Sequence, residues 1–328
     1  MTIQGINREV EREIENLKSY IKGFINANID MSEDGINTRR DAFQATIDNC
    51  KEISKTKDGR TATCSASIPM NLLAIDYRYQ RVNNTAKLRK NWDVCKLMPI
   101  VVIPHYEQCI FIVVDGGGRC SVAADLGIDK LPAWIITLVP NDPEERLVFE
   151  AKFFMEQGRD DNKLRKVDQH YSMVICGDPA ACAIEKACNK YDVYVADKSK
   201  NHGRKTLGSY KDAYKVADES GFGALDFIFS IIENVGWSTK NNGYSACVIR
   251  SLGNVYALHP HHRNEIHEFL SNSLKIYEPE DFMTKAKAKY LMRDYRNACI
   301  LYIEDMVCNK MKLERKVYIE NGRMKKGA

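Results

Sequence analysis

The sequence predicts an α+β protein: a small mixed-sheet α/β domain with an N-terminal helical hairpin and a C-terminal all-α domain. Three patterns lead to this prediction. Residues 1–64 carry apolar side chains at helical spacing, residues 65–168 alternate short β-branched runs with helical segments, and residues 169–311 carry helical patterns almost throughout. Residues 312–328 form a basic tail that is expected to be frayed.

Two apolar patterns at steps of three or four predict helices in the N-terminal segment. They comprise Ile6, Val10, Ile14, Leu17, Ile21 and Phe24, and then Phe43, Ile47, Cys50 and Ile53. We interpret them as a helical hairpin that packs on the rest of the protein. The alternative is a coiled coil that forms a homodimer through these helices, although fewer than four clean heptads are present.

Four short apolar runs in the central segment predict strands, because they are rich in β-branched residues and end at turn residues. They read SIPMNLLAID, PIVVIP, CIFIVVD and LPAWIITLV. Helical spacing appears in TAKLRKNWDVCKLM and in RCSVAADLG. The predicted order is therefore strand, helix, strand, strand, helix, strand, followed by a helix that begins near Pro143.

Composition excludes several classes of protein. The chain has 328 residues, of which 44% are apolar and 28% charged, so it is expected to fold around a sizeable core. It has no apolar run of the ~18 residues that a membrane span requires, and its charged N-terminus does not resemble a signal peptide, so we expect a cytoplasmic protein without membrane contact. The 11 cysteines form no CxxC pair, which predicts reduced thiols rather than a metal framework.

The stretch IFIVVDGGGRCSVAADLG carries the clearest functional pattern. A buried strand is expected to end at Asp115, and Gly116, Gly117 and Gly118 then lead into a helix through Arg119. Glycines let backbone amides approach a ligand, a helix start favours anions, and a guanidinium binds phosphate with a planar fork. The pattern predicts a phosphate site, with Asp115 near a Mg²⁺ ion or a reacting group; the alternative is an ordinary glycine-rich turn with an exposed arginine.

Three separated elements resemble the ParB/sulfiredoxin superfamily. DGGGR lies at a strand-to-helix turn, IPMNLLAIDYRYQR and LRKNWDVCKLMPIVVI precede it, and FFMEQGRDDNKLRKVD follows it. The resemblance covers residues 68–168. The later helical half resembles that of ParB-like proteins carried by phages and other mobile elements.

The resemblance implies a nucleotide site. Arg119 matches the arginine that grips phosphate, Gly116, Gly117 and Gly118 match the backbone nest, and Gln80 and Arg81 match the element across the pocket. Gln157 and Arg159 match a further turn of the family. The implied ligand is a nucleoside triphosphate of unspecified base, with Mg²⁺ at Asp115. Replacing Arg119 with alanine is then expected to abolish binding and to leave the melting temperature nearly unchanged.

The superfamily includes CTP-hydrolysing partition proteins that clamp on DNA, ATP-dependent sulfiredoxins, serine kinases and nucleases, so the fold alone does not choose an activity. Gly117 stands where a sulfiredoxin has its reactive cysteine, the motif lacks the histidines of other relatives, and one of two usual arginines is missing. The leading hypothesis is a ParB-like nucleotide-binding protein of a phage or mobile element that acts on DNA, as an NTP hydrolase or phosphotransferase if it is an enzyme. The alternatives are a non-catalytic DNA- or protein-interaction module and, third, a Mg²⁺-dependent nuclease that uses Asp115.

A basic segment near the C-terminus predicts a DNA-binding face. Lys285 and Lys289 are four residues apart, and Arg293 and Arg296 continue the spacing. One helix would present all four to a nucleic-acid backbone. A solvated helix face explains the same spacing, and the net charge of +4 is too small to decide between the two interpretations.

Overall fold

The computed structural model describes residues 29–80, 85–157, 165–195, 203–320 and 323–326. The chain divides into two compact units, Met1–Leu164 and Arg165–Ala328, and each is described by itself. The apolar pattern from Ile6 to Phe24, on which the homodimer hypothesis rests, lies outside the described residues.

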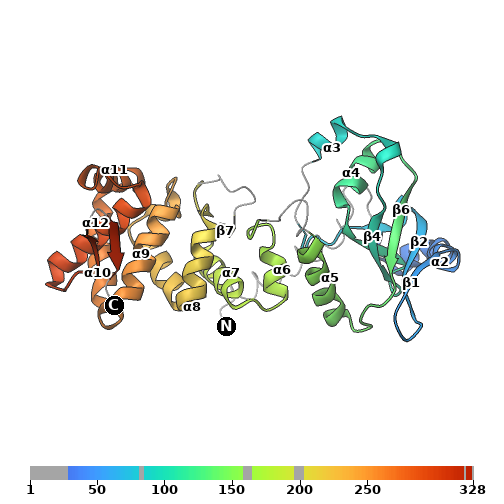
Figure 1. Cartoon of the computed structure of the whole chain (residues 1–328), viewed down its shortest axis with the longest axis horizontal. Helices are drawn as coiled ribbons and strands as arrows, with labels where there is room; N and C mark the ends of the chain where they lie inside the picture. Colours follow the sequence, from blue (N-terminus) through green and yellow to red (C-terminus); the bar gives the residue numbers. More distant parts are fainter. Residues whose placement is uncertain (1–28, 81–84, 158–164, 196–202, 321–322, 327–328) are drawn as a thin grey trace. The chain divides into compact units, whose positions relative to one another are not determined.

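The first unit is built on one mixed six-stranded sheet with the order β1-β2-β6-β4-β5-β3 (Figure 1). The strands are β1 (Lys51–Lys55), β2 (Thr61–Pro69), β3 (Leu73–Ala74), β4 (Ile100–His105), β5 (Ile110–Asp115) and β6 (Lys130–Ile136). β4 pairs antiparallel with β5 and parallel with β6, and β3 pairs parallel with β5. The predicted mixed sheet is confirmed, and the order of strands and helices over residues 86–157 is as predicted. The run SIPMNLLAID, predicted as one strand, is instead divided between β2 and β3 by a 3₁₀ turn.

Four α-helices complete the first unit among its described residues. They are α2 (Glu33–Asp48), α3 (Ala86–Lys90), α4 (Gly117–Asp125) and α5 (Pro143–Gln157), with short 3₁₀ turns at Met70–Leu72 and Val94–Lys96. α5 begins at Pro143 as predicted, and Asp142 Oδ1 accepts hydrogen bonds from the backbone amides of Glu144 and Glu145. Its two first-turn acids therefore lie where the helix dipole favours them.

The prediction that helix continues through Cys50 and Ile53 is wrong. α2 ends at Asp48, and the following residues form β1, which pairs antiparallel with β2. Pairing with β2 satisfies the hydrogen-bonding groups of this segment's backbone. Ile53 therefore lies in a strand, with its apolar side chain exposed to solvent. α2 packs on the sheet through Phe43, whose ring centroid lies 4.7 Å from that of Phe111.

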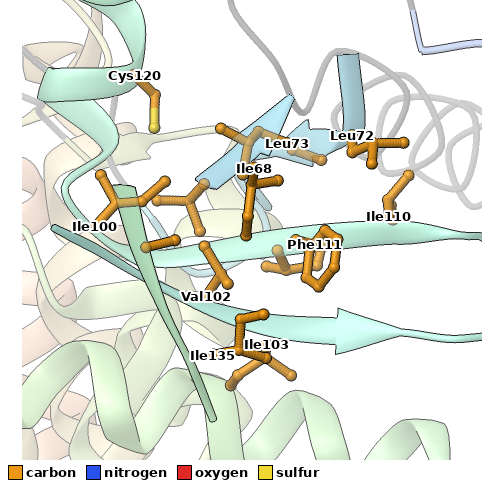
Figure 2. Packing of buried hydrophobic residues seen from close by; sticks show 14 of the residues in the cluster. Ile68, Leu72, Leu73, Ile100, Val102, Ile103, Ile110, Phe111, Cys120 and Ile135 are labelled. Carbon is orange, nitrogen blue, oxygen red and sulfur yellow. The ribbon is translucent and has the colours of Figure 1, made fainter. Parts of the chain in front are cut away.

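The central strands explain why this unit is stable. Every residue of β4 is buried, and so is every residue of β5 before Asp115. Figure 2 shows Val102, Ile103 and Phe111 of these strands packed in one apolar cluster with Leu72 and Leu73. A strand buried on both faces needs a continuous apolar sequence, which IVVIP and IFIVV supply.

The second unit is mainly helical, as predicted. Its described helices are α6 (His170–Ile175), α7 (Pro179–Tyr191), α8 (Tyr210–Asn234), α9 (Ala246–Leu258), α10 (Arg263–Ser273), α11 (Pro279–Lys289) and α12 (Tyr295–Met311), with 3₁₀ turns at Trp237–Thr239, Pro260–His262 and Leu274–Ile276. α8 is kinked at Gly221, where φ is +68°. A short strand, β7 (Tyr194–Val195), pairs parallel with β8 (Thr206–Leu207).

The tail differs from the prediction of a frayed arm. β9 (Val317–Glu320) and β10 (Arg323–Lys326) form an antiparallel hairpin. The hairpin is anchored because Glu304 Oε1, in α12, accepts hydrogen bonds from the amides of Lys316 (2.6 Å) and Val317 (3.2 Å). A buried carboxylate with two amide donors holds the start of β9 more firmly than the sequence indicates.

Across the residues that the structure describes, no helix is both long enough and apolar enough to cross a membrane.

Candidate functional site

The glycine-rich turn joins β5 to α4 through a backbone shape that requires glycine. Gly116 has φ +92° and ψ 16° and caps α4. A Cβ atom there would lie 2.7 Å from Ile100 Cγ2 and 2.8 Å from Arg119 Nη2. Gly116 is therefore required twice, for its left-handed backbone and for the close approach of the guanidinium.

Arg119 joins three segments at this turn. Its Nη1 donates to the carbonyl oxygens of Met98 (2.7 Å) and Pro99 (2.8 Å), and its Nη2 donates to Asp115 Oδ2 (2.7 Å). The side chain is 19% exposed. The guanidinium thus fixes the loop before β4, the end of β5 and the first turn of α4 to one another.

The same turn retains unused hydrogen-bonding capacity. Bonds between Arg119 and the described residues use three of its five N–H donors, which leaves Nε and one Nη2 hydrogen for a further acceptor. Asp115 is 41% exposed and accepts from Arg119 through one oxygen only. The first amides of α4, which follow Gly116, have no acceptor within the helix. Cationic, anionic and amide groups therefore meet at one partly exposed turn.

Gln80 contacts β5, the strand that leads to this turn. Its Nε2 donates to the carbonyl oxygen of Val113 in β5 (2.6 Å), and the residue is buried. Gln80 therefore fixes the DYRYQ segment to β5 two residues before Asp115. Arg81 and Arg159 lie outside the described residues, and Gln157 is the last residue of α5.

Cys120, which follows Arg119, faces the core. It is fully buried, and burial raises the pKa of its thiol to about 12. At neutral pH it is a protonated thiol without access to solvent, which is unsuited to redox chemistry.

The predicted single basic helix is two helices. α11 ends at Lys289, and α12 begins at Tyr295 after its cap Asp294. Lys289 forms an ion pair with Asp305, and Arg296 lies 3.4 Å from Asp212 Oδ2. The prediction that Lys285, Lys289, Arg293 and Arg296 share one helix face is therefore wrong, and their role toward DNA remains a prediction.

A buried polar network in the first unit was missed by sequence reasoning. His105 Nε2 lies 2.6 Å from Glu150 Oε1, and the Tyr79 hydroxyl donates to Glu150 Oε2 (3.2 Å). The network ties α5 to the end of β4 and to the DYRYQ segment. These residues are 45 and 71 positions apart, so no spacing in the sequence signals their contact.

Replacement of Gly116 by alanine should destabilise the first unit more than the matched replacement Gly59→Ala. Gly59 has a similar φ of +85° but open space around its Cβ position. Strain of a left-handed alanine costs ~1–2 kcal/mol at either site. At Gly116 the clash with Ile100 and Arg119 adds ~1–3 kcal/mol. Denaturant midpoints measure the difference, and equal losses for the two variants would contradict the described close approach.

Alkylation should distinguish Cys120 from Cys95, which is exposed. At pH 8 the raised pKa keeps Cys120 protonated, and burial denies it to the reagent. Iodoacetamide followed by mass spectrometry should label Cys95 in the native protein and Cys120 only after denaturation. Rapid labelling of native Cys120 would show that α4 does not pack as described.

Comparisons with known proteins find similarity in structure alone: no family model and no curated protein sequence matches the chain. One similar solved structure is the C-terminally truncated chromosome-partitioning protein ParB from Caulobacter crescentus complexed with CTP-gamma-S, at 13% identity and a TM-score of 0.23, over 70% of this chain and 99% of that one. Another is a Pnob8-like ParB-N domain, at 11% identity and a TM-score of 0.32, over 68% of this chain and 97% of that one. Both of these solved structures are ParB structures.

Proposed function

We propose that the β5–α4 turn binds the phosphates of a nucleoside triphosphate and that the protein uses this ligand in a DNA transaction of the ParB type. The observation that carries the proposal is the hydrogen bonding of the Arg119 guanidinium. Two backbone carbonyls hold its guanidinium in place, yet it keeps two N–H donors beside Gly116 and the first amides of α4. A cation fixed in advance loses little freedom when an anion binds.

Asp115 makes a divalent cation part of the proposal. Its carboxylate would repel a bare triphosphate, whereas a Mg²⁺ ion between that carboxylate and the phosphates would remove the repulsion. Mg²⁺ typically binds one or two carboxylates together with substrate phosphates and water, and a half-exposed carboxylate at the end of a strand fits that pattern. We therefore expect binding to depend on Mg²⁺.

The geometry favours binding over fast turnover. Hydrolysis or phosphotransfer needs a group that orients or deprotonates the attacking oxygen. Asp115 can position water through its second oxygen. The buried His105 cannot serve at this turn, because it pairs with Glu150 and lies at the opposite end of β4 from Ile100, the residue beside Gly116. We infer slow or no hydrolysis, to be measured as phosphate release.

A screen of ATP, CTP, GTP and UTP, each with and without Mg²⁺, tests the proposed ligand. At least one nucleotide with Mg²⁺ should raise the melting temperature and bind measurably in calorimetry. Arg119→Lys keeps the charge and loses the fork, so affinity should fall about tenfold or more, as expected for charge-assisted hydrogen bonds of ~1.5–3 kcal/mol.

The control variant is Arg89→Ala. Arg89 pairs with Asp125 at the other end of α4 and is half-exposed, so this variant should bind nucleotide normally. Arg119→Ala is a poorer probe than the sequence suggested, because it removes three internal hydrogen bonds and should itself lower the melting temperature. Unchanged affinity in Arg119→Lys would refute the site.

A non-catalytic interaction module is the second candidate, and the hydrogen bonds of Arg119 to Met98, Pro99 and Asp115 favour it. They give the arginine a structural role that needs no ligand. No thermal shift with any of the four nucleotides, together with salt-sensitive DNA binding, would support it. A nuclease would instead show Mg²⁺-dependent cleavage that Asp115→Asn abolishes.

DNA binding is tested at Lys285 and Arg293, two basic residues of the predicted segment. Lys285 Nζ lies 4.5 Å from the centroid of the Tyr277 ring. The double variant Lys285→Gln, Arg293→Gln should weaken binding to a fluorescent duplex and lower the slope of log affinity against log salt by ~0.9 for each lost phosphate contact. Lys310→Gln, an exposed change at the end of α12, is the control. Equal salt slopes in all three proteins would exclude this surface.

A further inference from the structure

The second unit contains a cavity of about 920 Å³ that the proposed function does not use. Its walls are the first half of α8, Arg250 of α9, Arg296 of α12 and the segment before α6. Concave sites of this size typically hold small organic ligands. All of its lining residues belong to the second unit.

The lining is strongly cationic. Six basic side chains line it together with three acidic ones, Asp212, Asp218 and Glu219. Asp168 also pairs with Arg165, which leaves an excess of two positive charges. The basic residues are Arg165, Lys166, Lys211, Lys215, Arg250 and Arg296. A low-dielectric hollow with such an excess attracts anions.

Two arginines share one carboxylate at the inner wall. Arg250 Nε lies 3.4 Å from Asp212 Oδ1, and Arg296 Nη2 lies 3.4 Å from Asp212 Oδ2. Asp212 is buried and also accepts a 2.6 Å hydrogen bond from Ser209 Oγ. One carboxylate neutralises one of the two guanidiniums, so a net positive charge stays at this wall.

A buried donor without an acceptor lies beside this pair. A second cavity of about 100 Å³ shares Glu219, Arg250 and Arg296 with the first, and Asn254 lines it. Asn254 is 8% exposed, and its Nδ2 has no hydrogen-bond partner among the described residues. Buried donors are usually satisfied in folded proteins, so this amide points to an acceptor that the described residues do not supply.

We propose that these adjacent cavities bind a small phosphate-bearing molecule, with its phosphate on Arg250, Arg296 and Asn254 and its organic part in the larger cavity. Phosphate fits because it offers only acceptors, whereas these three side chains offer donors. The volume greatly exceeds that of a lone phosphate and leaves room for an organic part. The concave shape favours a small molecule over the backbone of a nucleic acid.

Calorimetry of the full chain with inorganic pyrophosphate and with ribose 5-phosphate tests the site. Both probes should bind saturably. Asn254→Asp replaces the unsatisfied donor with a negative charge and should weaken binding about tenfold or more. Asp212→Asn removes the competing carboxylate and should tighten binding several-fold, a change that a purely structural ion pair would not produce. Lys275→Gln, an exposed charge change outside the cavity, should bind like the wild-type protein.

Circular dichroism melting confirms that each variant is folded. If Arg250→Gln is folded, its affinity for the two probes provides a third test of the site. Arg119→Lys should leave the binding of both probes unchanged, which separates this site from the proposed nucleotide site. No binding of either probe, or identical affinities in the Asn254→Asp and Asp212→Asn variants, would overturn the proposal. Binding of a short DNA duplex that Asn254→Asp weakens, without binding of ribose 5-phosphate, would also overturn it in favour of a nucleic-acid contact.

Discussion

The close approach between Gly116 and the Arg119 guanidinium is the constraint on which the candidate site depends. The left-handed glycine lets α4 start immediately after β5, and the missing side chain makes room for Arg119 beside Ile100. The guanidinium then reaches the carbonyls of Met98 and Pro99. Without that approach, the end of β5, the start of α4 and the loop before β4 would lack a common anchor.

Under the proposed function, Arg119 would combine two roles that are often assigned to different residues. Hydrogen bonds to two carbonyls orient its guanidinium, and the single carboxylate of Asp115 pairs with it. The guanidinium is an internal clamp in the structure, and in the proposal it is also a receptor for an anion. The two roles are compatible because its five donors exceed the three internal hydrogen bonds.

The second unit handles buried charge in a different way. Glu304 is satisfied by amides at the start of β9 and by His259, whose Nε2 lies 3.2 Å from its carboxylate oxygens. Asp212, by contrast, lies between two arginines with longer contacts, and the buried amide of Asn254 has no hydrogen-bond partner among the described residues. One wall of the cavity therefore combines an excess of positive charge with an unpaired donor.

The sequence by itself determined the order of strands and helices around the glycine turn, because β4, β5 and α4 carry local patterns that match their structures. It also determined the start of α5 and most helices of the second unit. It could not determine that Cys50 and Ile53 leave the helix for β1, that the basic segment breaks after Lys289, or that the tail forms a hairpin. Pairing with β2, the cap at Asp294 and the carboxylate of Glu304 decided these points, and two of the three depend on partners distant in the chain.

Only the tertiary structure brought Arg250 and Arg296 to Asp212 and placed His105 against Glu150. Local periodicity records which face of an element is apolar, whereas the meeting of polar side chains depends on how separate elements pack.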